Sequence, residues 1–109
     1  MGAMPTMPGS QETQRARLLI AAGPRAGTLF PLIFGETLVG RIDSAQLVLE
    51  DSTVSRLHAR LSLRRDGVWI EDLGSREGTW INGVVVRRKR LNEGDRIAFG
   101  DVLLVFERG

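Results

Sequence analysis

The stretch DSTVSRLHARL, residues 51–61, places Ser55, Arg56 and His58 within four residues, and His58 is the single histidine of the chain. Such a group could do nucleophilic chemistry, because a histidine can remove the proton of a serine hydroxyl. It could instead bind an anion, since hydroxyl and guanidinium groups donate to phosphate or carboxylate oxygens. It could also be a plain loop whose side chains cap their own backbone.

Catalysis is the least favoured of the three interpretations. A serine nucleophile needs a base, a residue that orients the base, and an oxyanion hole, and no G-x-S-x-G motif surrounds Ser55. One histidine and no cysteine disfavour a transition-metal site. The chain also has no Walker loop and no G-x-G-x-x-G motif. We therefore expect no enzyme activity, no metal and no cofactor.

The elements that must position these residues are short strands. The 13 glycines of this 109-residue chain fall mostly between short apolar runs, which is typical of strands joined by tight turns. Asn82-Gly83 between two apolar runs is a strong hairpin signal. About ten short strands and no convincing helix predict an all-β fold, a two-sheet β-sandwich. The predicted strands include RLLIAA, TLFPLIF, ETLVGR, QLVL, VWIEDL, TWI, VVV, RIAFG and VLLVFE.

The opening stretch fits two patterns. Val54, Leu57 and Leu61 have helical spacing, whereas Leu57, Ala59, Leu61 and Leu63 alternate strictly with polar residues. The alternation lasts longer and is followed by the turn sequence RRDG, so it favours a strand. His58 then lies at the start of that strand, and we expect it to tie loop backbones together.

Residues 1–14 are polar and lack periodicity, so we expect a disordered tail or a terminal remnant followed by one domain over residues 15–109. No apolar run is long enough to span a membrane, and the N-terminus lacks a signal-peptide pattern. We therefore expect a cytoplasmic monomer. The net charge is +2, and 14 of the 15 basic residues are arginine, a composition that fits a GC-rich bacterial genome.

Three loops carry residues suited to an anion. GR at 40–41, SRLH at 55–58 and GSREGT at 74–79 each lie where a predicted strand meets a loop. Loops at one end of a sandwich cluster in space. Together they could present guanidinium and hydroxyl donors to a phosphate group, although a solvated loop charge is the commoner role of a single surface arginine. The predicted donors are Arg41, Ser55, Arg56, Ser75 and Arg76.

Four segments in this order resemble the forkhead-associated domain: GR at 40–41, VSRLHARL at 54–61, WIEDLGSREGTWING at 69–83 and LNEGDRIAFG at 91–100. The resemblance runs from about Arg17 to Phe106. It implies a sandwich of two twisted sheets that binds threonine-phosphorylated protein segments at its loop tips. By the same resemblance the domain is a signalling adaptor.

The resemblance also implies roles for single residues. Arg41 contacts the phosphate, Ser55 donates its hydroxyl to it, Arg56 adds a second charge, and Arg76 adds a contact near the phosphopeptide. His58 braces the loops behind the site. The residues that support the backbone paths around the site are Gly40, Gly78, Gly83 and Thr79.

Glu77 departs from the family pattern. The family commonly has asparagine before the glycine in this loop, where it bonds to the peptide backbone beside the phosphothreonine. An ionised glutamate only accepts hydrogen bonds and adds negative charge near a phosphate. A phosphate-independent scaffold is therefore a second hypothesis. Its surface would be the apolar VVV run at 84–86 next to RRKR at 87–90, although an exposed hairpin edge is the simpler interpretation of this run.

A third hypothesis is nucleic-acid binding through RRKR at 87–90. We favour instead a basic loop that protects a strand edge, because the chain has few aromatic residues and a small net charge. We therefore expect neither nucleic acid nor membrane among the partners.

Overall fold

The computed structural model describes residues 16–109, so the predicted tail over residues 1–14 lies outside the described residues. Within this range the chain forms strands and no helix, so no helix there could cross a membrane. The prediction of an all-β fold is confirmed. The strands are β1 Arg17–Ala22, β2 Leu29–Pro31, β3 Gly35–Gly40, β4 Leu47–Val48, β5 Ala59–Arg64, β6 Gly67–Asp72, β7 Thr79–Ile81, β8 Val84–Val86, β9 Arg88–Arg90, β10 Arg96–Phe99 and β11 Val102–Glu107.

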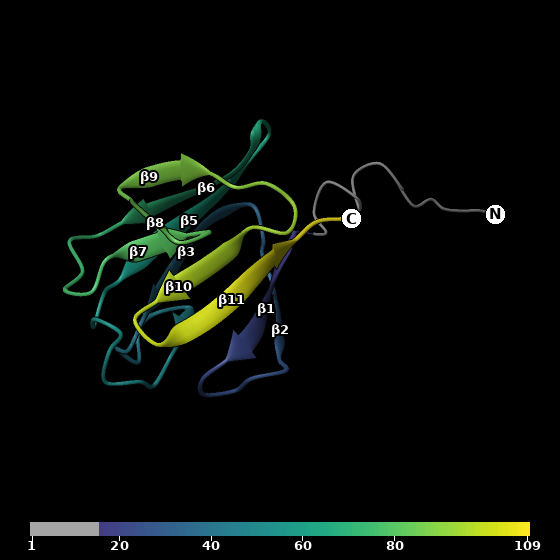
Figure 1. The fold of residues 1–109 in the computed structure, drawn as a ribbon. Helices are drawn as coiled ribbons and strands as arrows, with labels where there is room; N and C mark the ends of the chain where they lie inside the picture. The colour runs from purple at the N-terminus through teal and green to yellow at the C-terminus, as the bar shows by residue number, and fades with distance from the viewer. Residues whose placement is uncertain (1–15) are drawn as a thin grey trace.

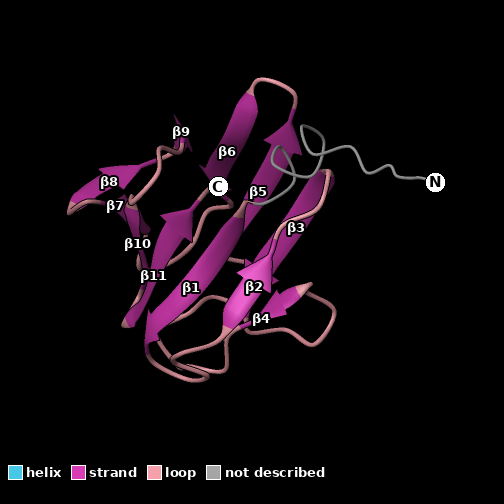
Figure 2. Cartoon of the chain, turned by 90° about the vertical axis from the view of Figure 1, so that its right-hand side faces the viewer, coloured by secondary structure: helices cyan, strands magenta, loops and turns pink. Residues whose placement is uncertain are grey.

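The strands form two sheets that face each other, as the sequence predicts (Figures 1 and 2). One sheet has the order β2-β1-β11-β10-β7-β8 and the other the order β4-β3-β5-β6-β9. We call them sheet A and sheet B. All pairs are antiparallel except β3 with β4, which run parallel. The loops on either side of β4 and the β6–β7 loop meet at one end of the sandwich, at the lower left of Figure 1.

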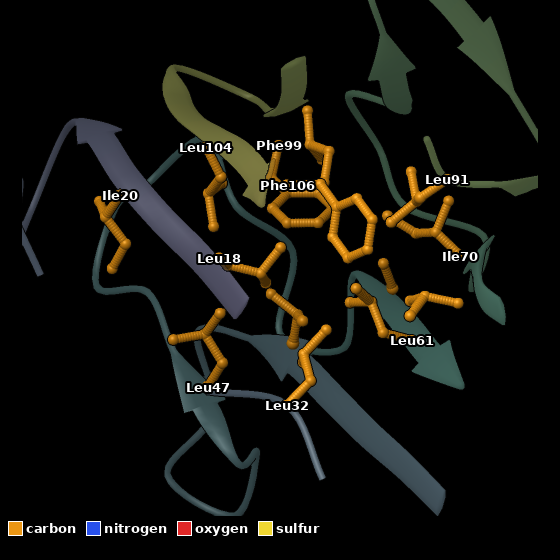
Figure 3. Packing of buried hydrophobic residues seen from close by; sticks show 14 of the residues in the cluster. Leu18, Ile20, Leu32, Leu47, Leu61, Ile70, Leu91, Phe99, Leu104 and Phe106 are labelled. Atoms are coloured by element: carbon orange, nitrogen blue, oxygen red, sulfur yellow. The ribbon is translucent and has the colours of Figure 1, made fainter. Parts of the chain in front are cut away.

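The core lies between the sheets and follows the alternation of the strands. In β11 every second side chain is buried, so Val102, Leu104 and Phe106 point inward. Phe106 and Phe99 pack with Leu18, Leu61 and other aliphatic side chains (Figure 3). A fully buried side chain of this size contributes about 1.5–3 kcal/mol relative to leaving it exposed. This rigid core is the base from which the loops extend.

The turn chemistry explains the hairpins. Asn82 and Gly83 have φ values of 53° and 83°, the left-handed conformation that a two-residue hairpin turn requires, and they join β7 to β8 as predicted.

In the stretch of residues 51–61 the strand begins later than the alternation of apolar residues predicts. Leu57 is 45% exposed and belongs to the loop, and β5 starts at Ala59.

Candidate functional site

A cavity of about 290 Å³ opens where the loops meet, and side chains from three segments line it. Arg41 follows β3, Ser55 and Arg56 lie in the loop before β5, and Arg76 lies in the loop between β6 and β7. The structure therefore brings together four of the five residues that the sequence predicts as phosphate donors. The full lining is Arg41, Ser52, Thr53, Val54, Ser55, Arg56 and Arg76.

Arg41 is exposed, and its guanidinium is anchored at one nitrogen. The Nε of Arg41 donates to the carbonyl of Val54 at 2.9 Å, and its backbone amide donates to the carbonyl of Ser55 at 3.1 Å. These two bonds join the end of β3 to the neighbouring loop. The two terminal nitrogens of the guanidinium remain for a ligand, in a fork that matches two oxygens of a phosphate.

The hydroxyl of Ser55 is oriented by the β6–β7 loop. Its Oγ accepts a hydrogen bond from the backbone amide of Arg76 at 3.0 Å. Because that bond uses a lone pair of the oxygen, the hydroxyl proton stays available for an acceptor in the cavity. The same bond connects the second and third segments of the site.

His58 lies behind the cavity, between the loop before β5 and the β6–β7 loop. Its side chain is fully buried and lies edge-on to Phe99, with ring centroids 5.0 Å apart. Its Nδ1 accepts from the backbone amide of Ser55 at 3.1 Å, and its Nε2 lies 2.8 Å from the carbonyl of Gly78. An amide only donates and a carbonyl only accepts, so these partners require a neutral ring with the proton on Nε2. In that form the ring joins two loops.

Asp72 organises the β6–β7 loop from the end of β6. Its carboxylate accepts from the backbone amides of Gly74 and Ser75 and from the hydroxyls of Ser75 and Thr79, at 2.6–3.0 Å. Burial alone would raise the pKa of Asp72, but these hydrogen bonds outweigh burial and lower the pKa below its ordinary value. The loop is therefore folded around an ionised carboxylate.

Ser75 and Glu77 do not line the cavity, unlike the other predicted ligand-binding residues. The hydroxyl of Ser75 donates to Asp72 and accepts from the amide of Gly78 at 2.9 Å, so it is used within the loop. Glu77 is exposed, and its carbonyl accepts from the indole of Trp80 at 3.0 Å. Ser75 thus shapes the loop, and the side chain of Glu77 lies outside the cavity lining.

Gly40 shows why the sequence has GR at this position. A Cβ atom on Gly40 would lie 1.9 Å from the carbonyl oxygen of Arg56, which no side chain can tolerate. The end of β3 can therefore approach the neighbouring loop only with glycine. Gly78 has a φ of 87°, which favours glycine, and Thr79 is fully buried against Asp72.

Ser52 and Thr53 also line the cavity, and sequence reasoning missed them. The amide and hydroxyl of Thr53 both donate to the carboxylate of Asp51, which lowers the pKa of Asp51. The Oγ1 of Thr53 in turn accepts from the amide of Asp101 at 2.8 Å. The sequence signal is D-S-T, since an aspartate commonly bonds to the backbone two residues later in a turn.

Within the part of the chain that the structure describes, no ion pair neutralises the arginines around the cavity. Among residues 16–109 the ion pairs within 4.0 Å join Arg17 to Glu107, Arg60 to Glu36 and Glu71, and Lys89 to Asp95. The pairs of Arg60 join strands of sheet B, and Lys89 of β9 pairs with Asp95 in the loop before β10. Arg41, Arg56 and Arg76 take part in none of them. Three guanidinium groups with no carboxylate partner in the described range, beside an oriented hydroxyl, make a site suited to an anion.

Comparison with known proteins identifies the family. The family model of the FHA domain, the forkhead-associated domain of the sequence analysis, matches residues 37–100. The chain belongs to the FHA family. This match contains the three loops of the site and most of sheet B.

Curated bacterial relatives are regulators by name. An oxoglutarate dehydrogenase inhibitor of Corynebacterium jeikeium is 37% identical over 86% of this chain and 65% of its own length. The glycogen accumulation regulator GarA of Mycobacterium tuberculosis is 37% identical over 86% of this chain and 58% of its own. The chain thus spans about three fifths of the length of these two relatives.

Solved FHA domains share the fold. An FHA domain of Chlamydia trachomatis superposes with a TM-score of 0.82 at 31% identity, covering 87% of this chain and 98% of its own. Another, from a study of phosphothreonine-dependent FHA domain interactions, has a TM-score of 0.81 at 29% identity, covering 86% and 96% of the two chains.

The second hypothesis was a phosphate-independent scaffold and the third was nucleic-acid binding. The segments on which they rest form edge strands of the two sheets. The VVV run is β8, one of the two outer strands of sheet A, and Val84 and Val85 are 62% and 56% exposed. The basic run is not the loop that we predicted, because three of its residues form β9, the outer strand of sheet B. In β9, Arg88 stacks on Trp69 at 4.3 Å and Lys89 lies 3.7 Å from Asp95. Basic residues on an outer strand discourage pairing with other chains.

Proposed function

We propose that this FHA domain is an adaptor that binds a threonine-phosphorylated segment of another protein in the cavity between its loops, and that it catalyses no reaction. The observation that carries the proposal is the group of Arg41, Arg56 and Arg76, which have no carboxylate partner among residues 16–109, with the proton of Ser55 available beside them. An arginine cluster of this kind is a recurring mode of phospho-motif recognition.

Each residue has a distinct task in this proposal. Arg41 donates from its two terminal nitrogens to the phosphate, and Ser55 donates its hydroxyl. Arg56 and Arg76 add positive charge at the rim. His58, Gly40 and Asp72 hold the three segments in place without touching the ligand.

The names of the bacterial relatives support a cellular role for the domain. Regulators from Corynebacterium and Mycobacterium support a signalling role in a bacterial cell. We place the protein in the cytoplasm as a monomer, with the phosphorylated protein as its partner and no nucleic acid or membrane.

The test is calorimetric titration with a phosphothreonine peptide selected from a degenerate library, beside the same peptide with unmodified threonine. We expect binding only to the phosphorylated form. Arg41→Ala should weaken it at least about a hundredfold, since two charge-assisted hydrogen bonds of about 1.5–3 kcal/mol each are lost. The matched control is Arg65→Ala, an exposed arginine in the β5–β6 turn. Equal binding of both peptides, or an Arg41→Ala protein that binds as wild type does, would refute the proposal.

A further inference from the structure

The outer faces of the two sheets differ in chemistry. On sheet B the outward side chains form charged cross-strand pairs such as Arg60 with Glu71. On sheet A a row of apolar side chains crosses four adjacent strands. In register from β11 to β8 the row is Leu103, Ala98, Trp80 and Val85. Trp80 is 40% exposed and Val85 is 56% exposed.

A groove of about 850 Å³ lies over this row, on the face of sheet A that is turned toward the viewer in Figure 1. Ala98 and Leu103 belong to its lining, together with Trp80. Three glycines and an asparagine from the neighbouring turns complete it, with Arg96 as its single charged residue. A recess with apolar side chains, bounded by turns that lack bulky groups, fits a large apolar side chain.

Trp80 is fixed in place before any ligand arrives. Its indole nitrogen donates to the carbonyl of Glu77 at 3.0 Å. A Cβ atom on Gly78 would lie only 3.2 Å from that nitrogen, so backbone and ring are in close contact. An aromatic side chain that is already ordered loses little conformational entropy on binding.

The groove lies beside the phosphate cavity, and two contacts connect the segments that line them. Gly100 lines the groove and abuts Thr53, which lines the cavity, and the amide of Asp101 donates to the hydroxyl of Thr53. At the second contact, the indole of Trp80 in the groove donates to the carbonyl of Glu77, the residue that follows Arg76 of the cavity. The groove is therefore within reach of a molecule bound in the cavity.

We propose that the groove receives a bulky apolar segment of the same partner whose phosphothreonine occupies the cavity. This proposal rests on the proposed function of the cavity. The phosphate then supplies the charge-dependent part of the binding. The groove selects among phosphorylated partners, because it binds only those that also carry an apolar segment outside the phosphorylated segment. Joining the two contacts in one molecule raises the affinity through effective concentration.

The test uses the selected phosphothreonine peptide extended by Gly/Ser linkers of graded length, ending in either Leu-Phe-Leu or Ser-Asn-Ser. We expect the apolar extension to bind at least about tenfold more tightly than the polar one at an optimal linker length. Leu103→Ser and Ala98→Glu should abolish this gain and leave binding of the unextended peptide unchanged. Val105→Ser, which changes an outward residue of the same strand outside the groove, should retain the gain.

The outcomes separate this proposal from the proposed function. Absence of binding by the unextended phosphopeptide would refute the phosphate site itself. Binding of that peptide with no gain from the apolar extension at any linker length would overturn the groove proposal alone. Thermal unfolding shows whether each variant is folded, and Ala98→Glu and Leu103→Ser provide independent variants. Self-association of the wild type that Ala98→Glu abolishes would make a second copy the occupant and would also overturn the proposal.

Discussion

Ser55 and His58 lie three residues apart but act differently. Ser55 presents a hydroxyl to the cavity, whereas the buried ring of His58 fills space and joins the amide of Ser55 to the carbonyl of Gly78. Ser55→Ala should weaken phosphopeptide binding with little loss of stability. His58→Ala should lower the free energy of unfolding by about 2–4 kcal/mol, because it leaves a cavity and two unsatisfied backbone groups. Thermal and urea unfolding of both proteins measure this, and equal stabilities would contradict the division of roles.

Glu77 is the residue where this chain departs from the family pattern. An asparagine there can both donate and accept, and it removes a negative charge near the phosphate. Glu77→Asn should tighten phosphopeptide binding about two- to tenfold, the equivalent of one hydrogen bond of ordinary strength. Part of the gain should disappear at high salt, which screens the repulsion in the wild type. Calorimetric titration at two salt concentrations is the measurement, and weaker binding would show that the glutamate is itself a ligand contact.

The site residues were predictable to different degrees. The clustering of Arg41, Ser55, Arg56 and Arg76 was predictable because each lies where a predicted strand meets a loop, and loops at one end of a sandwich lie close together. Ser75 has the same type and setting, but its hydroxyl bonds within its own loop, and only the path of that loop reveals this. Similarly, Thr53 reaches the cavity through a turn whose shape depends on Asp101, 48 residues away.

At the scale of the element, the end of β3 depends on the absence of a side chain at Gly40. The carbonyl of Arg56 occupies the space that a Cβ would fill. Gly40→Ala should therefore cost about 3 kcal/mol or more in unfolding free energy and should weaken phosphopeptide binding, because overpacking displaces the loop that carries Arg56.

Gly27→Ala is the control for the Gly40 variant. Gly27 has a φ of 93° with no neighbouring atom within 4 Å of the added Cβ, so only backbone strain of about 1–2 kcal/mol is expected there. Urea unfolding compares the two variants. A Gly40→Ala protein as stable as Gly27→Ala would show that β3 can move away without cost.

The β6–β7 loop should respond to acid through Asp72. The pKa of Asp72 is lower in the folded protein than in the unfolded chain, so its contribution to stability is present above the unfolded value of about 3.9. That contribution is lost as the pH falls through the lower folded value. The stability difference between the wild type and Asp72→Asn should therefore be constant above about pH 5 and shrink below about pH 4. Urea unfolding across this range measures the difference, and a difference that does not change with pH would contradict this role.

At the scale of the whole molecule, the two-sheet sandwich was predictable because period-two alternation and turn residues are local signals. Asn82-Gly83 identified the β7–β8 hairpin, and the alternation of Ala59, Leu61 and Leu63 with polar residues identified β5. The sheet order was not predictable in this way, since β1 pairs with β11 and Arg17 faces Glu107 across 90 positions of sequence. The parallel pair of β3 and β4 carries no local signal either. The convergence of the three loops follows from this global arrangement.

The three arginines that line the cavity affect the speed of complex formation. A net charge of +2 is modest, but the charge that faces a ligand is concentrated at one end of the sandwich. A dianionic phosphate approaching that end is attracted before contact, so its association is faster than unguided diffusion to a small target. Added salt should lower the association rate constant of the phosphorylated partner and should change its dissociation rate constant much less. A partner would then be captured as soon as a kinase has modified it, and the lifetime of the complex would depend mainly on short-range contacts.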